Sequence, residues 1–125
     1  EEDKVTPKLI EAKLLKANLN DANLSESDLS GTNLVGVNLS NVNFSGANLS
    51  GTNLSKVDLT GSNLTKADLT GAKLVDANLT GADLTEADLS RANLSGANLS
   101  GTNLTKANLT GVNLRNSYLE DNLIS

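Results

Sequence analysis

The sequence predicts an all-β chain wound into a four-sided parallel β-helix, a quadrilateral solenoid. Two observations carry this prediction. A leucine falls on every fifth residue from Leu9 to Leu119, with Phe44 as the one exception. All ten glycines lie two residues after such a position. We number each repeat from its leucine, position i, so that the small residue before it lies at i−2 and the glycines lie at i+2.

A period of five fits neither regular secondary structure. Successive residues of a helix turn by about 100°, so a step of five moves by about 140° and forms no apolar stripe. Side chains alternate along a long strand, so a step of five would send each leucine to the opposite face. The chain must therefore bend once in every repeat.

Each repeat divides into an extended part and a corner. In the extended part the small residue and the leucine point to one side, and residue i−1 points to the other. Position i−1 is Asn or Asp nearly throughout, as at Asn33, Asn48 and Asp58. The corner is a β-turn whose third residue, i+2, has positive φ, which Gly and Asn adopt at little cost.

Glycine is shared unequally between alternate corners. Seven glycines lie in the series that runs from Asp21 to Gly111, and three lie in the series from Lys16 to Lys106. This alternation predicts two kinds of turn and an even number of corners per coil. Two sides leave no room for paired leucine rows, so we predict a square coil of four repeats. Coils that stack at about 4.8 Å would form a rod of about 5.5 coils and roughly 25 Å.

The two ends depart from the repeat. Thr6 as N-cap, Pro7 at the first helical position, and Ile10 and Leu14 four residues apart predict a short helix that covers the open end. The alternative is that residues 9–15 already begin the first coil. We therefore expect a segment 1–11 with the capping helix, a β-helix over 12–121 and a tail over 122–125. The tail offers little cover, which predicts weak end-to-end self-association through the C-terminal coil or a longer parent protein.

Composition narrows the function classes. The formal net charge is −5, with neither His nor Cys in the chain. A mildly acidic surface is not the basic footprint of a nucleic-acid-binding protein. Without His and Cys, the common nucleophile–base pairs and transition-metal clusters are excluded. We expect no enzymatic activity, no cofactor and no metal, and a protein as partner.

Localisation is less constrained by the sequence. No apolar run is long enough to span a membrane, and the chain shows no signal peptide, so we expect a soluble protein. The acidic stretch over residues 1–4 fits a processed terminus after export to the periplasm or a thylakoid lumen. It fits a cytoplasmic chain equally well.

Folding the sequence into four sides places residues 20 positions apart above one another. One side then concentrates acidic residues at i−1. This side carries Asp28, Asn48, Asp68, Asp88 and Asn108. We identify Asp28, Asp68 and Asp88 as a candidate docking strip for a basic partner or a weak Ca²⁺ site. The alternative is a solvated side on which Asp replaces Asn at little cost.

The repeat also writes the triplet Asn-x-Ser/Thr eleven times, as at residues 23–25 and 48–50. Such triplets are glycosylation acceptors in secreted eukaryotic proteins. We interpret them instead as a by-product of Asn at i−1 and Ser or Thr at i+1.

The motif Ala-Asn/Asp-Leu-x-x, as in residues 47–51 and 87–91, is similar to that of the pentapeptide-repeat family over about 110 of the 125 residues. The resemblance implies a right-handed four-sided β-helix. Leu at i with Ala at i−2 is most similar to cyanobacterial and plastid-type members, and the near-perfect repeat would also suit a designed consensus protein.

The resemblance leaves three function classes open. The first, which we favour, is a structural or interaction module. The second is a DNA mimic, because some members bind DNA gyrase by imitating duplex charge. Those members favour Phe at i and a more acidic surface, unlike this chain. The third is ice binding by ranks of Ser and Thr at i+1, whose irregular mixture is a poor lattice match.

Overall fold

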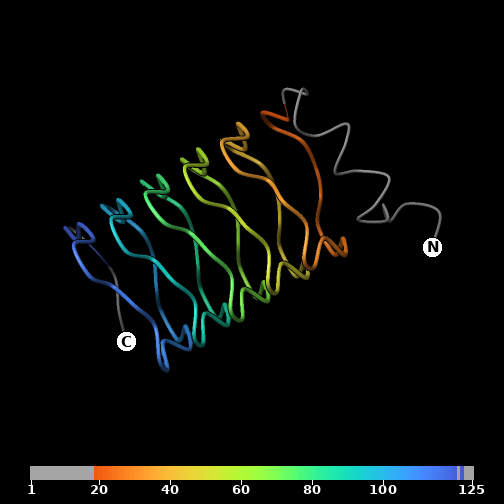
Figure 1. Cartoon of the computed structure of the whole chain (residues 1–125). Helices are drawn as coiled ribbons and strands as arrows, with labels where there is room; N and C mark the ends of the chain where they lie inside the picture. Colours follow the sequence, from red (N-terminus) through yellow and green to blue (C-terminus); the bar gives the residue numbers. More distant parts are fainter. Residues whose placement is uncertain (1–18, 121, 123–125) are drawn as a thin grey trace.

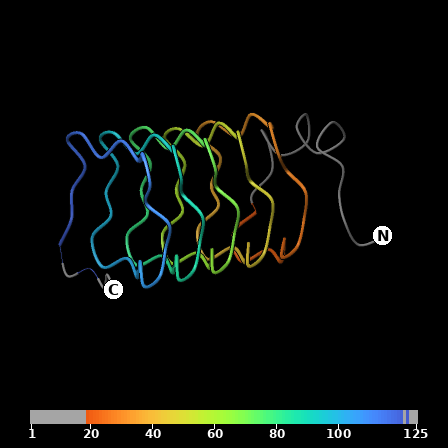
Figure 2. The same cartoon turned by 90° about the horizontal axis from the view of Figure 1, so that it is seen from below.

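The computed structural model describes residues 19–120 and 122. Within these residues the chain forms neither a helix nor a continuous strand, and each repeat contributes one bridge residue at i−1. Sixteen parallel bridges join residues 20 positions apart, from Asn23↔Asn43 to Asn98↔Tyr118. The predicted coil of four repeats is therefore confirmed. The coils stack side by side along one axis (Figures 1 and 2).

Backbone hydrogen bonds hold the coils together. In one central repeat the N–H of Asn63 donates to the preceding coil at 2.9 Å. The N–H groups of Leu64 and Lys66 donate to the following coil at 2.7 and 2.9 Å. The N–H of Ala67 closes the corner by donating to the carbonyl of Leu64 at 3.1 Å. Four of the five N–H groups of a repeat are thus paired with other backbone groups.

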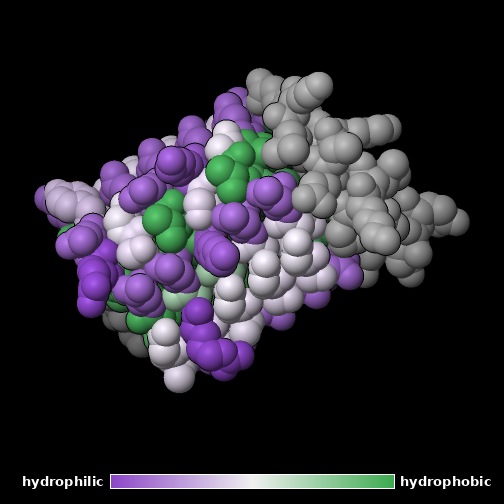
Figure 3. Space-filling view, viewed as in Figure 1, coloured by the Kyte–Doolittle hydropathy of each residue, from purple (hydrophilic) through white to green (hydrophobic). Residues whose placement is uncertain are grey.

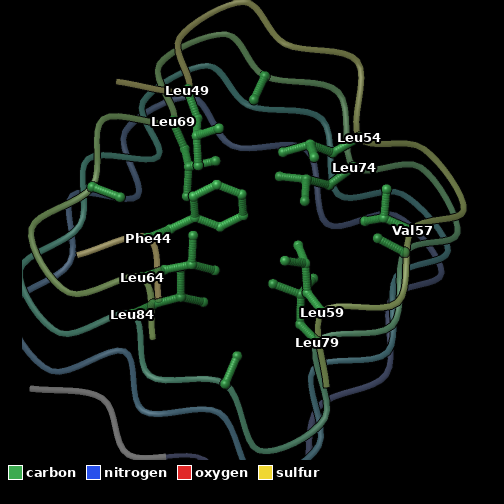
Figure 4. Packing of buried hydrophobic residues seen from close by; sticks show 14 of the residues in the cluster. Phe44, Leu49, Leu54, Val57, Leu59, Leu64, Leu69, Leu74, Leu79 and Leu84 are labelled. Atoms are coloured by element: carbon green, nitrogen blue, oxygen red, sulfur yellow. The ribbon is translucent and has the colours of Figure 1, made fainter. Parts of the chain in front are cut away.

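The leucines and the i−2 side chains fill the interior. Phe44, Leu64 and Leu84 are each fully buried and form one row. This row faces Leu54 and Leu74 across the interior (Figure 4). Because full burial of a leucine contributes about 1.5–3 kcal/mol, stacked rows of leucines can stabilise a chain that has almost no aromatic residues. The predicted inward and outward positions are confirmed.

The prediction of two kinds of corner is wrong. Gly51 has φ 65° and Lys56, at the next corner, has φ 61°. All described i+2 residues have positive φ, ten of them glycines and ten of them not. The hydrogen bonds around i+2 are the same at both kinds of corner, since Gly51 and Lys56 each donate to the following coil at 2.9 Å, and they hold i+2 at the same positive φ. The four sides of the coil follow from the 20-residue bridges and not from an alternation of turns.

Some large corner side chains lie over a glycine of the next coil. The carboxylate of Glu26 occupies the space that a Cβ at Gly46 would need, and that of Asp76 does the same at Gly96. A glycine therefore makes room for the corner residue below it at these two places.

Several predictions concern residues outside the described part of the chain. The capping helix over residues 6–16, the first repeats and residues 121 and 123–125 lie there. The total of about 5.5 coils and the boundaries 1–11, 12–121 and 122–125 therefore stay predictions.

Candidate functional site

The outward side chain at i−1 has a structural role that the sequence analysis missed. Its Oδ1 accepts a hydrogen bond from the N–H of residue i+1, the one backbone donor that the coils leave unpaired. Asn63 accepts from Thr65 at 3.0 Å, and Asp68 accepts from Thr70 at 3.0 Å. Asn and Asp are suited to this role because they form Asx turns. The same bond recurs in 18 repeats between Asn23 and Arg115.

The hydroxyl at i+1 often donates to the same Oδ1. Thr65 donates to Asn63 at 2.8 Å, and Thr110 donates to Asn108 at 2.7 Å. This pairing explains why Asn at i−1 is so often followed by Ser or Thr at i+1. It supports the interpretation of the Asn-x-Ser/Thr triplets as a product of the repeat.

Lys73 is the exception among the i−1 residues from 23 to 113. Its side chain has no oxygen to accept the N–H of Val75, and Val75 has no hydroxyl to donate. This repeat therefore has neither of the two bonds.

The three predicted acidic residues lie in one column. Parallel bridges join Asp28 to Asn48, Asn48 to Asp68, and Asp68 to Asp88. Asp68 and Asp88 are on neighbouring coils, and Asp28 is two coils from Asp68. We call Asp28, Asp68 and Asp88 the acidic column.

Hydrogen bonds hold the pKa of Asp88 below its ordinary value of 3.8. The main cause is the N–H of Ser90, which donates to Oδ1 at 3.0 Å, followed by the Ser90 hydroxyl. Partial burial opposes this effect, while the Thr70 hydroxyl and the positive charge of Arg91 add to it. Asp88 is therefore ionised at neutral pH beside the carboxylate of Asp68.

Basic residues lie beside the acidic column and not within it. Arg91 is at the corner that follows Asp88, and Lys73 is in the column of the next side. The corners that follow Asp28 and Asp68 are Gly31 and Gly71. Only this edge of the column is bare, because Glu26 and Lys66 occupy the corners that precede Asp28 and Asp68.

The described part of the chain offers a surface without hollows. No pocket opens among residues 19–120 and 122. In the same residues no group of three or more acidic side chains could hold a metal ion. The face in Figure 3 is mainly hydrophilic, and its apolar atoms form small separate patches. No described helix is long and apolar enough to cross a membrane.

The last described coil is less covered than the others. Tyr118 and Leu119 are exposed by 53% and 45%. Asn122 packs against the coil before it, where its Nδ2 donates to the carbonyls of Leu99 at 2.6 Å and Thr102 at 3.3 Å. The N–H groups of Leu109, Gly111, Leu114 and Asn116 form no hydrogen bond with any residue that the structure describes.

Stacked four-sided coils, a leucine interior and outward Asx turns define a solenoid built from five-residue units. The family model for pentapeptide repeats matches the chain in eight copies, over residues 8–41, 43–81 and 82–121. The chain belongs to the pentapeptide-repeat family. Proteins of this family form right-handed β-helices, as the resemblance implied.

Two solved cyanobacterial structures are similar to this chain. The pentapeptide-repeat protein Rfr23 from Cyanothece 51142 is 36% identical, with a TM-score of 0.50 over 82% of this chain. The chain spans 64% of the length of Rfr23. The pentapeptide-repeat protein alr5209 from Nostoc PCC 7120 is 29% identical, with a TM-score of 0.50, and 98% of this chain matches 97% of it. Among curated proteins none matches the chain.

Proposed function

We propose that this chain is a non-enzymatic interaction module that presents the flat sides of the solenoid to a protein partner. The observation that carries the proposal is the use of polar groups within the repeat. Oδ1 at i−1 and the donors at i+1 are already bonded to each other. The described sides therefore present no group of unbonded polar atoms that could act together on a substrate. What distinguishes one side from another is its charge.

The acidic column is the proposed contact, and a basic protein segment is the proposed partner. Asp68 and Asp88 add their charges on neighbouring coils, and the bonds from Ser90 keep Asp88 ionised. The corners at Gly31 and Gly71 place no side chain on one edge of the column, whereas Lys66 lies at the opposite edge beside Asp68. The attraction between exposed charges is screened within about 8 Å at physiological salt, so binding should weaken as salt rises.

A matched pair of double variants tests the acidic column. Asp68→Asn with Asp88→Asn removes two charges from the column, and Asp58→Asn with Asp83→Asn removes two from other columns. Asn keeps the Oδ1 acceptor, so both variants should fold. The probe is a labelled Lys- and Arg-rich peptide, titrated by fluorescence anisotropy. We expect several-fold weaker binding for the first variant alone, and equal weakening in both would refute the assignment.

Two deletions test the geometry at constant net charge. Removal of residues 47–51, which are uncharged, turns Asp28 by one side away from Asp68 and Asp88. Removal of residues 42–61, which contain one Lys and one Asp, keeps every column in register and brings Asp28 next to Asp68. The shorter deletion should weaken peptide binding and the longer one should strengthen it. The opposite order would show that total charge, not the column, attracts the peptide.

The DNA-mimic alternative has less support. Duplex DNA carries one phosphate charge per about 1.7 Å of its axis. The acidic column spans five coils that are about 4.8 Å apart. It has three carboxylates, with Asn48 between Asp28 and Asp68 and Asn108 beyond Asp88. Inhibition of gyrase supercoiling by the parent protein, lost in the Asp68→Asn and Asp88→Asn variant, would establish this alternative instead.

Ice binding also has less support. A lattice match needs regular ranks of hydroxyl groups that are free to bind water. In the described repeats the hydroxyl often donates to Oδ1 of its own repeat, as Thr65 does. Val35, Val75 and Arg115 interrupt the rank on one side.

We further propose weak end-to-end self-association through the last described coil. Its N–H groups that have no acceptor among the described residues, together with the exposed Tyr118 and Leu119, form an edge that a second copy can meet. Sedimentation velocity over a range of concentrations tests this. A sedimentation coefficient that stays constant up to high protein concentration would refute it.

A further inference from the structure

The repeat supplies many copies of one dipeptide, Asn at i−1 followed by Leu at i. An asparagine can deamidate when the backbone nitrogen of the next residue attacks its side-chain Cγ. Because the next residue is leucine in each copy, the intrinsic reactivity of these asparagines is similar. Differences between them must come from the structure around the leucine nitrogen.

In the stacked coils this nitrogen is held in the hydrogen-bond ladder. The N–H of Leu94 donates to Asn113 at 2.8 Å, and the N–H of Leu99 donates to Tyr118 at 2.7 Å. To attack the preceding Cγ, the nitrogen must leave its acceptor and the coil must open locally. Such opening is rare in the stable part of a protein. The ladder therefore protects Asn93 and Asn98.

The last described coil shows no such bonds to its leucine nitrogens among the described residues. The nitrogens of Leu109 and Leu114 form no hydrogen bond with any described residue. The preceding residues, Asn108 and Asn113, are exposed to solvent. Oδ1 of Asn108 accepts from the N–H of Thr110, and Oδ1 of Asn113 accepts from the N–H of Arg115, at 3.0 Å in both cases. Neither bond involves the leucine nitrogen.

We propose that Asn108 and Asn113 are sites of spontaneous deamidation with water as the co-reactant. The nitrogen of Leu109 forms a bond to Cγ of Asn108, the bond from Cγ to Nδ2 breaks, and ammonia leaves with the proton of the leucine N–H. Water then opens the cyclic imide to aspartate or isoaspartate. At Asn108 the product adds a carboxylate next to Asp88, which lengthens the acidic column by one coil.

Tryptic digestion separates the two groups of asparagines. After the purified protein has been aged at mildly alkaline pH, cleavage at Lys106 and Arg115 yields peptide 107–115, with Asn108 and Asn113. Cleavage at Arg91 and Lys106 yields peptide 92–106, which contains Asn93 and Asn98 together with Asn103. Fragmentation by mass spectrometry assigns the deamidated residue. We expect deamidation at Asn108 and Asn113 to be about 10-fold faster or more, because it needs no opening of the ladder.

Three controls make the result decisive. Ageing in concentrated urea should bring all four rates together, because the unfolded chain has no ladder. Hydrogen exchange should show fast amides at Leu109 and Leu114 and slow amides at Leu94 and Leu99. Sedimentation should first confirm that the protein is monomeric at the concentration used, so that self-association cannot pair the edge.

The proposal is refuted by similar native rates at the four asparagines, by faster reaction at Asn93 and Asn98, or by no deamidation at Asn108 and Asn113 under conditions that deamidate the unfolded chain. None of these outcomes bears on the acidic column as a docking site, which is tested with freshly prepared protein.

Discussion

The Asx turns of the repeat should make a measurable contribution to stability. Asn93 accepts the N–H of Ser95 at 3.0 Å, and both residues are half-buried. Asn93→Ala leaves this N–H without an acceptor in the repeat. A typical intramolecular hydrogen bond contributes about 0.5–1.5 kcal/mol, because water replaces part of what is lost. We expect Asn93→Ala to lower the free energy of unfolding by about that amount.

Lys73 offers the opposite change in the same column. Lys73→Asn supplies the missing acceptor for the N–H of Val75 and should raise the free energy of unfolding by about 0.5–1.5 kcal/mol. Lys73→Ala removes the charge without supplying an acceptor. It should leave the stability nearly unchanged, which separates the effect of the hydrogen bond from that of the charge.

Urea unfolding followed by circular dichroism measures these changes. With a slope of about 1–3 kcal/mol per molar urea, a change of about 1 kcal/mol shifts the midpoint by about 0.3–1 M. The expected order of midpoints is Lys73→Asn, then the parent and Lys73→Ala, then Asn93→Ala. If Lys73→Asn and Lys73→Ala had the same midpoint, the Asx turn would contribute nothing measurable.

Three other predictions follow from the same structure. Leu64→Asp buries a carboxylate without a partner and should cost several kcal/mol, seen as a large fall in Tm, whereas Asn63→Asp points outward and should change Tm little; equal Tm values would contradict the inward and outward positions. Gly51→Val should lower Tm more than Lys56→Val, because both corners have positive φ and Lys56 already bears the cost that Gly51 avoids, and Lys56→Gly should raise Tm; no rise in Lys56→Gly would restore the two-turn interpretation. Because the pKa of Asp88 is lowered in the folded chain, its stabilisation is present above the ordinary value of 3.8 and is lost as pH falls below it. Below about pH 4 the parent should therefore lose more stability than Asp88→Asn in thermal melts, and parallel curves would contradict this.

The coil could be predicted from the sequence because each repeat has the same length. A period of five forces one bend per repeat, and the interior then selects the leucine and the small residue before it. The acidic column follows from the same register, since residues 20 apart lie together wherever no repeat is lengthened or shortened. The bridges from Asp28 through Asn48 to Asp68 show that this register holds.

The role of the i−1 residue was missed because its outward position already explained its polarity. Asn and Asp can be outward simply because they are hydrophilic, and that reason is sufficient without a bond. The better signal was the pairing of two positions. Where Lys73 replaces Asn or Asp, Val75 replaces Ser or Thr. The link is partial, because Asn33 and Asn113 form the turn with the N–H groups of Val35 and Arg115, which have no hydroxyl that could add the second bond seen in Ser and Thr repeats.

The uneven spread of glycine led to the correct number of sides for a reason that the structure contradicts. All described corners have positive φ at i+2, so glycine is favourable at each of them, and ten of them carry another residue. At Gly31, Gly51 and Gly71 an added Cβ would meet no atom within 4 Å, so packing does not demand glycine there either. Left-handed conformation costs other residues roughly 1–2 kcal/mol, a cost that Lys56 and Arg91 bear at corners of the same shape. The choice between glycine and a charged residue therefore affects the surface more than the fold. Glycine at four of the five corners that follow the acidic column leaves that edge largely without side chains. An approaching basic segment would need such an edge.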